Sequence, residues 1–400
     1  MIPSFFLDRL NARSKASAAA RIALVIASLG LGACALPTDP TVRDGAADDL
    51  PGTQGVLYVG GKYKDGNTRA GVTGQAFVFY QIPKDNQPGR NGKWPIVMVH
   101  GAEQTGANYL GTPDGRPGWA WYFFSRGWPV YVIDQPGRGK SGYFPDVYGP
   151  QAKSPDPARV QALFTASELT RPLAWPQAAL HTQWPGGPGS GTPGHEAFDL
   201  FMASQVANMP EYKQALSLTT DAIGKLLSKI GPAILITHSM TGPVSWMVPQ
   251  ANPGKIKAII AIEPTGNSSL RGDSAPGSPC GLSDECLAFS PPIKGAGDLG
   301  LINTPSYIPG LQNCWLQKNL PARMLTGLSG IPVLIATGEA SYHAQYDHCT
   351  SAFLAQAGVP NTWLILATVG IKGNGHMQMI ELNNLAIARY YEQWLLSKLQ

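Results

Sequence analysis

The chain has 400 residues and a formal charge of +4, and only 14% of its residues are charged. Most of the basic excess lies at the start, where four basic residues and Asp8 give residues 1–33 a net charge of +3, so the remainder is near +1 (4 − 3). A balance this close to neutral excludes the basic field that a nucleic-acid partner requires. With 46 Gly and 35 Pro, the composition is typical of a loop-rich, folded exported protein.

The first 33 residues have the pattern of a secretory signal peptide. Basic residues precede an apolar run over 22–33, which is shorter than the roughly 20 residues that a membrane span needs. The end of this run, Leu31-Gly32-Ala33-Cys34, resembles a bacterial lipobox, in which Cys34 is acylated and becomes the new N-terminus. Plain cleavage at the small residues 33–35 is the alternative. We therefore expect an exported protein, either a membrane-anchored lipoprotein or one free in the periplasm or medium.

Four cysteines remain beyond Cys34, an even number that suits an oxidising compartment. Three connectivities are possible for four cysteines. We favour the short-range pairing, Cys280 with Cys286 and Cys314 with Cys349.

A linker over 34–54 leads into a predicted domain over 55–400. Residues 55–63 and 75–83 are expected to form an antiparallel pair at a sheet edge. Short, continuously apolar runs then indicate strands buried on both faces. These runs cover 94–101, 128–137, 233–239, 256–264, 331–339 and 363–370, and helical patterns lie between several of them, as at 212–230 and 379–399. The alternation predicts an α/β fold with a mainly parallel central sheet flanked by helices.

Two long stretches interrupt this order, residues 143–211 and 264–330. Loops of such length inside a compact domain are usually functional or disordered. Both follow the carboxyl ends of strands, where α/β sheets bind ligands. We expect these two insertions to form a cap over the site.

Five motifs occur in the order found in α/β-hydrolases: "VMVHGAEQTG", "VIDQPGRGKSG", "LITHSMTG", "TGEASYHAQYDHC" and "GNGHMQMIELNN". They resemble most closely the bacterial and fungal esterases grouped as esterase-713-like, over about residues 55–400. The resemblance implies the α/β-hydrolase fold and hydrolysis of carboxylic esters by a serine nucleophile, without a cofactor.

The motif "LITHSMTG" is a variant of the G-x-S-x-G nucleophile elbow, with Thr237 and Thr241 at the two glycine positions. A serine that merely ends a strand is the alternative reading. Pro243 suits a first helical turn, where its missing N–H costs nothing. Taken with the other motifs, the pattern predicts Ser239 as the nucleophile. Alternation along the strand predicts that His238 points to the other face.

The base and the acid complete the predicted triad. Of seven histidines, His376 alone follows the last strand and precedes the last helix, where this fold carries its base. Most members of the fold place the acid after the seventh strand, where Glu339 and Asp347 are available. The esterases resembled here place a glutamate after the sixth strand, and Glu263 matches it. We favour Glu263 and assign structural roles to the other two carboxylates.

Backbone N–H groups are expected to form the oxyanion hole, because they hold negative charge without reorganising. Met240 follows the nucleophile and supplies one donor, and Ala102 or Glu103 supplies the other. The side chain of Glu103 should turn away, since a carboxylate in the hole would oppose the oxyanion.

Three tryptophans are candidates for the acyl pocket. Trp175 and Trp184 lie in the first insertion, and Trp246 follows the nucleophile; core packing is the alternative for each. His343 and His348, with Asp347 between them, lack the ligand spacing of a known metal site, so no metal is predicted.

We therefore predict an exported carboxylesterase that acts on a small-molecule or polymeric ester through an acyl-enzyme. Cleavage of a thioester, lactone or amide on the same site is one alternative. A non-catalytic envelope binding protein on a hydrolase scaffold is the other. The sizes of the acid and alcohol parts of the substrate are expected to be set by the two insertions.

Overall fold

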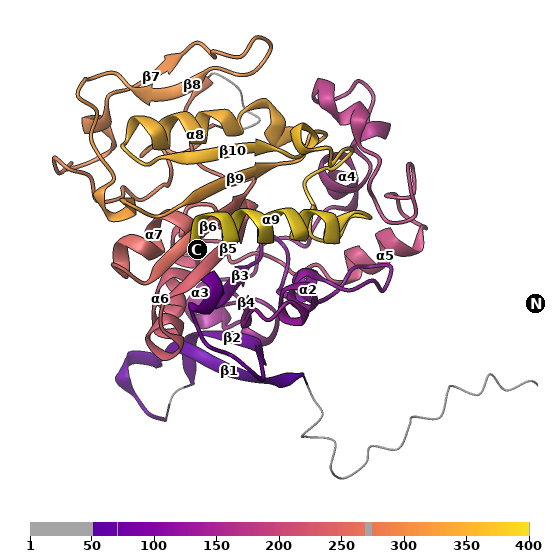
Figure 1. The fold of residues 1–400 in the computed structure, drawn as a ribbon, viewed down its shortest axis with the longest axis vertical. Coiled ribbons are helices and arrows are strands. Elements are labelled where there is room, and N and C mark those ends of the chain that lie inside the picture. The colour runs from indigo at the N-terminus through magenta and orange to yellow at the C-terminus, as the bar shows by residue number, and fades with distance from the viewer. Residues whose placement is uncertain (1–50, 70, 269–273, 400) are drawn as a thin grey trace, which may run out of the picture. The chain divides into compact units, whose positions relative to one another are not determined.

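The structure, a computed structural model, describes residues 51–69, 71–268 and 274–399. Its main sheet has eight strands in the order β1-β2-β4-β3-β5-β6-β9-β10 (Figure 1). The strands are β1 (Gly52–Tyr63), β2 (Val72–Pro83), β3 (Ile96–Val99), β4 (Val130–Asp134), β5 (Ala233–His238), β6 (Ile256–Ile262), β9 (Val333–Thr337) and β10 (Asn361–Ile365). The six strands β4, β3, β5, β6, β9 and β10 pair in parallel, whereas β1 and β2 are antiparallel at one edge. The predicted α/β fold with a mainly parallel sheet is confirmed.

Helices lie between and beside these strands. They are α1 (Ala107–Leu110), α2 (Trp119–Ser125), α3 (Pro145–Tyr148), α4 (Pro157–Val160), α5 (Glu196–Ala203), α6 (Tyr212–Ile230), α7 (Val244–Ala251), α8 (Asp347–Gln356) and α9 (Asn384–Leu399). The helix predicted over 212–230 has the observed bounds of α6. The last helix begins at Asn384 rather than at 379, because Glu381 and Asn383 hydrogen-bond to the preceding loop through Asn374.

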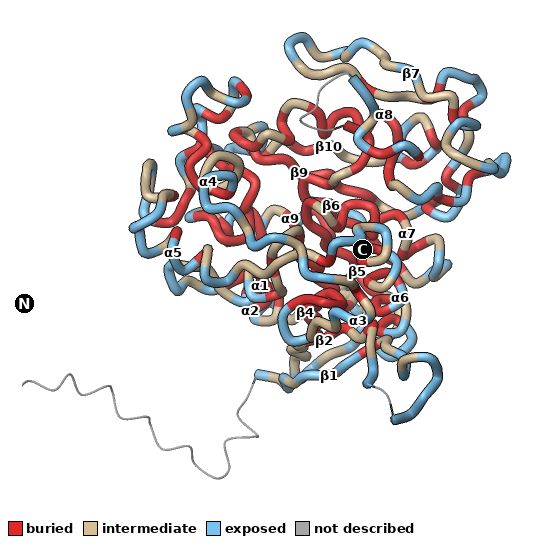
Figure 2. The backbone as a smooth tube through the Cα atoms, turned by 180° about the vertical axis from the view of Figure 1, so that it is seen from behind, coloured by how far each residue is buried: buried red, intermediate tan, exposed pale blue. Residues whose placement is uncertain are grey.

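The sheet separates two hydrophobic clusters, as the two-residue period of buried strands requires. Val97 and Leu235 belong to the cluster with α6, α7 and α8, whereas Met98 and Ile236 belong to the cluster with α2, α5 and α9. Buried backbone accordingly runs through the middle of the molecule in Figure 2. None of the helices in the described part of the chain is long and apolar enough to span a membrane.

The two insertions contribute side chains to different hydrophobic clusters. The first insertion (residues 143–211) contains α3, α4 and α5 and adds Val160 and Trp184 to the cluster of α2 and α9. The second insertion (residues 264–330) adds Leu282 and Leu325 to the cluster of α6 and α7. It also carries a separate antiparallel pair, β7 (Leu301–Thr304) and β8 (Cys314–Gln317). The predicted signal peptide, Cys34 and the linker up to residue 50 lie outside the described residues.

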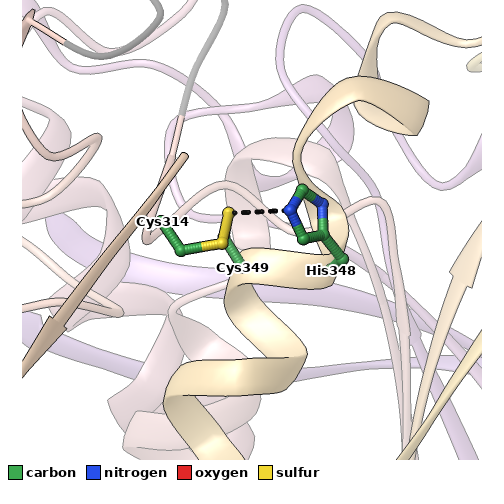
Figure 3. A group of neighbouring side chains, drawn as sticks. All are labelled: Cys314, His348 and Cys349. Atoms are coloured by element: carbon green, nitrogen blue, oxygen red, sulfur yellow. Dashed lines mark hydrogen bonds between the residues drawn. A yellow bond between two sulfur atoms is a disulfide. The ribbon is translucent and has the colours of Figure 1, made fainter. Parts of the chain in front are cut away.

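The described residues contain two disulfides, Cys280–Cys286 and Cys314–Cys349, which is the pairing favoured from the sequence. The second disulfide joins β8 of the second insertion to α8 (Figure 3). His348 lies beside it, with Nε2 at 3.5 Å from Sγ of Cys349. The second insertion is therefore attached covalently to the sheet-flanking helix α8.

Candidate active site

Ser239 lies where β5 ends and a short turn leads toward α7. Its φ is +54°, a left-handed value that is costly for a residue with a side chain. The strand–turn–helix order and this strained backbone are those of a nucleophile elbow. The serine is 7% exposed, so it lies just below the surface.

The elbow accommodates threonine at both motif positions by hydrogen bonding. Thr241 Oγ1 donates to the carbonyl of His238 at 2.9 Å, and Thr237 Oγ1 lies 2.6 Å from Oγ of Ser245. The close backbone approach occurs one residue later, at Gly242. A Cβ built there would lie 2.6 Å from Cβ of Pro264, which leaves no room for a side chain. The second insertion therefore begins in contact with the elbow.

His376 and Glu263 come together from two different strand ends. Glu263 directly follows β6, and His376 lies in the loop between β10 and α9. Nδ1 of His376 lies 2.5 Å from Oε2 of Glu263, and both side chains are at most 1% exposed. This contact leaves Nε2 as the ring nitrogen that can take a proton.

The Glu263 carboxyl is surrounded by donors. Gly338 N–H donates to Oε1 at 2.8 Å, the hydroxyl of Ser341 donates to Oε2 at 2.6 Å, and Gln378 Nε2 donates to Oε1 at 3.2 Å. Burial raises the pKa of Glu263 to about 8, and the neighbouring His343 and the hydrogen bonds from Ser341 and Gly338 limit that rise. His376 is a further donor. Surroundings made of donors suit an ionised carboxylate, because it only accepts hydrogen bonds and has no proton that would need an acceptor.

The two alternative acids are bonded to other groups. Glu339 Oε1 accepts from the N–H of Gly373 at 2.5 Å. Asp347 lies 2.7 Å from Nδ1 of His343 and accepts from Oγ1 of Thr337 at 2.7 Å. Among the three carboxylates considered from the sequence, Glu263 is the one in contact with His376.

His238 has a position that strand alternation alone does not predict. Its Nε2 donates to the carbonyl oxygen of His376 at 3.0 Å, and the two ring centroids are 4.5 Å apart. The prediction that it points away from the site is wrong, because the loop carrying His376 folds against the end of β5. His238 holds the backbone of that loop.

The expected oxyanion donors differ in availability. The N–H of Glu103 donates to Oδ1 of Asn208 at 2.8 Å, so the first insertion already occupies this donor. The carboxylate of Glu103 lies 3.8 Å from Nη1 of Arg159. This geometry favours Ala102 over Glu103 as the partner of Met240.

The three tryptophans lie in different surroundings. Trp184 and Trp246 are at most 1% exposed and belong to the two hydrophobic clusters, so they are core side chains and we correct their placement in an acyl pocket. Their large apolar surfaces stabilise the insertion and α7 instead. Trp175 packs edge-on against Tyr342, with ring centroids 5.8 Å apart, and its Nε1 donates to the carbonyl of Ala340.

Two residues of the site were missed in the sequence. The ring of Phe164 stacks on that of His376, with centroids 5.0 Å apart, and the hydroxyl of Tyr342 lies 3.3 Å from Nε2 of His376. Tyr342 belongs to the motif "TGEASYHAQYDHC", which draws attention through its acids. Phe164 lies in the first insertion, where no periodic pattern marks it.

In the described part of the chain, two groups of buried side chains have metal-ligand chemistry. The potential ligand atoms of Glu263, His343 and His376 lie within 4.8 Å of one another, as do those of Cys314, His348 and Cys349. The sulfurs of the second group are joined in a disulfide and are not thiolates. In the first group, a metal ion would compete with the short hydrogen bond between Glu263 and His376.

Comparison with known proteins places the chain in a family. No family model matches it. The "Probable secreted lipase phiG" of Fungal sp. (strain ATCC 74256) is 37% identical over 343 residues, which cover 85% of this chain and 88% of that protein. The structure described as "The Atomic Resolution Structure of a Novel Bacterial Esterase" matches with a TM-score of 0.55 at 24% identity, covering 88% of this chain and 97% of that one, and shows the shared fold. The chain therefore belongs to the family of the fungal secreted lipase, a family of ester-hydrolysing enzymes with the α/β-hydrolase fold.

Proposed function

We propose that the protein is an exported serine carboxylesterase with Ser239 as nucleophile, His376 as base and Glu263 as acid. The observation that carries this proposal is the 2.5 Å contact between Nδ1 of His376 and Oε2 of Glu263, which leaves Nε2 as the proton acceptor. An acid that follows β6 also supports placement among the esterase-713-like enzymes.

In the proposed reaction, Nε2 of His376 removes the proton from Ser239 while Oγ attacks the ester carbonyl. The N–H groups of Met240 and Ala102 hold the oxyanion. The imidazolium, stabilised by Glu263, then protonates the departing alcohol. Water repeats the sequence on the acyl-enzyme and releases the acid.

The proposal extends to processing and organisation. Residues 1–33 act as a signal peptide, Cys34 is the acylated N-terminus, and residues 55–400 form the hydrolase with the two insertions as its cap. The name of the fungal relative, which includes the word "secreted", supports export. Mass spectrometry of the native mature N-terminus tests it, since acylation adds lipid mass to Cys34, and an unmodified N-terminus elsewhere would contradict the lipid anchor.

The triad is tested with p-nitrophenyl acetate and a fluorophosphonate probe. Ser239→Ala and His376→Ala should each lower kcat by several orders of magnitude, on the order of 10³-fold or more, and the double variant should be little worse, because the two groups act as a unit. Ser228→Ala is the matched control, since its hydroxyl caps a carbonyl within α6 at the surface. Probe labelling that persists in Ser239→Ala would refute the proposal.

The acid is tested separately. Glu263→Gln should lose far more kcat than Glu339→Gln or Asp347→Asn, because Glu263 alone of the three contacts His376. The opposite ranking would move the acid to the loop after β9.

A further inference from the structure

We propose that Tyr342 is a further catalytic residue, whose hydroxyl donates a hydrogen bond to the oxygen of the departing alcohol beside Nε2 of His376. This inference rests on the proposed esterase function. The hydroxyl lies 3.3 Å from Nε2, and the side chain of Ser239 is close enough to the phenol to lower its pKa. The hydroxyl therefore lies beside both groups between which the proton moves.

Neighbouring residues hold Tyr342 in its position. It begins the turn Tyr342–Gln345 after β9. The preceding residue, Ser341, hydrogen-bonds to Glu263 Oε2 and accepts from the N–H of His343 at 3.2 Å. The rings of Phe164 and Trp175 in the first insertion lie 6.3 and 5.8 Å from the phenol ring. The hydroxyl is thus held by the same loop that orients the acid.

The sheet order shows on which side of the nucleophile the phenol lies. The oxyanion loop follows β3, which pairs with one side of β5. Tyr342 follows β9, which is separated from β5 by β6 on the other side. The phenol therefore approaches from the side opposite the oxyanion donors. A group beside Nε2 on that side meets the oxygen that receives the proton from Nε2, not the carbonyl oxygen.

The proposed step conserves protons. When the tetrahedral intermediate collapses, the C–O bond to the alcohol breaks and its electron pair stays on the alcohol oxygen. The proton from Nε2 of His376 is transferred to that oxygen, while Tyr342 keeps its own proton and donates a hydrogen bond. Burial and the neighbouring Glu263 carboxyl raise the pKa of Tyr342, so the phenol stays protonated through the cycle.

This role predicts a dependence on the leaving group. A hydrogen bond to the departing oxygen gains strength as that oxygen carries more negative charge, so it matters most for basic alcohols. The test measures kcat/KM of wild type and Tyr342→Phe for acetate esters of p-nitrophenol, phenol and ethanol. We expect a loss of about 2-fold for p-nitrophenyl acetate that grows to about 100-fold for ethyl acetate, the scale of one hydrogen bond to a charged group. Phenylalanine preserves the ring packing with Phe164 and Trp175.

Tyr346→Phe is the matched control, because its ring lies 6.4 Å from that of Tyr342 in the same segment. It should show the wild-type leaving-group dependence. An equal loss for all three esters in Tyr342→Phe, or no loss, would overturn the role of Tyr342. Wild-type protein that hydrolyses none of the esters, or activity that survives Ser239→Ala, would instead overturn the esterase proposal itself.

Discussion

The two insertions are attached to the hydrolase core by different chemistry. The second insertion is joined to α8 by the Cys314–Cys349 disulfide. The first insertion is held by a buried charge cluster in which His181 lies between Glu168 and Glu381, at 3.0 Å from each carboxylate. One attachment is covalent and responds to reductant, whereas the other is ionic and responds to pH.

The ionic attachment reaches the candidate site directly. Glu381 also accepts from the N–H of Gly375 at 2.8 Å and from Nδ2 of Asn374 at 2.7 Å. Gly375 precedes His376, so His181 connects the first insertion to the loop that carries His376. Because both ring nitrogens face carboxylates, both must carry protons, and the ring is an imidazolium.

The covalent attachment reaches the site less directly. Cys349 lies in the first turn of α8, which begins at Asp347. Asp347 contacts His343, whose ring stacks on that of His376 with centroids 5.1 Å apart. Both insertions are thus connected to the surroundings of His376, through linkages that fail under different conditions.

The largest expected effect is loss of the disulfide between the insertion and α8. Cys314→Ser with Cys349→Ser opens a cross-link of 35 residues and should lower the free energy of unfolding by about 4 kcal/mol on the chain-entropy model. Cys280→Ser with Cys286→Ser, with a separation of 6, is the matched control and should cost about 2 kcal/mol. Urea denaturation measures both, and an equal or reversed ranking would contradict the model.

The second largest effect is expected when a rise in pH removes the charge of His181 and so weakens the ionic attachment. Burial alone would lower the pKa of His181, but its bonds to Glu168 and Glu381 outweigh burial and raise the pKa from 6.5 to about 9. Because the folded pKa exceeds the unfolded one, the stabilisation is complete below about pH 6.5 and is lost as the pH rises through about 9. Its size is on the order of 3 kcal/mol.

His181→Gln tests this window. The variant should be less stable than wild type at pH 6, and the difference should shrink by pH 9.5 in thermal unfolding. His195→Gln is the control, because His195 is an exposed histidine of the same insertion. A stability difference that stays constant between pH 6 and 9.5 would show that the charge of His181 contributes nothing.

The smallest expected effect is a change in substrate preference caused by the first insertion. Trp175 is the first-insertion tryptophan in contact with Tyr342, so Trp175→Ala should change the preference between short and long acyl chains by about 1–3 kcal/mol. Trp121→Ala is the control, because that side chain of α2 is 49% exposed. The measurement is kcat/KM for a chain-length series of p-nitrophenyl esters. An unchanged profile would direct the search for the acyl pocket to residues 264–330.

Local patterns in the sequence were sufficient for the sheet and for the order of the candidate residues. Continuous apolar runs predicted the buried strands, and the helical period over 212–230 predicted α6 with its observed bounds. The position of Ser239 after a strand predicted its turn, because a strand-to-helix junction is a local feature. Glu263 and His376 could be selected because each follows a strand whose end is known to face the same edge of a parallel sheet.

Tertiary structure decided what depends on contacts between distant segments. The N–H of Glu103 is occupied by Asn208, 105 residues away, and His181 bonds to Glu381 across 200 residues. The burial of Trp184 and the contact of Tyr342 with His376 likewise depend on how the first insertion and the loop after β9 pack on the sheet. These segments have neither helical nor strand periodicity. Their sequence therefore does not predict which side chains are buried or which groups they contact. Only the packing of the folded chain selects among those partners, because hydrogen bonds and apolar contacts form between whichever groups the fold brings together.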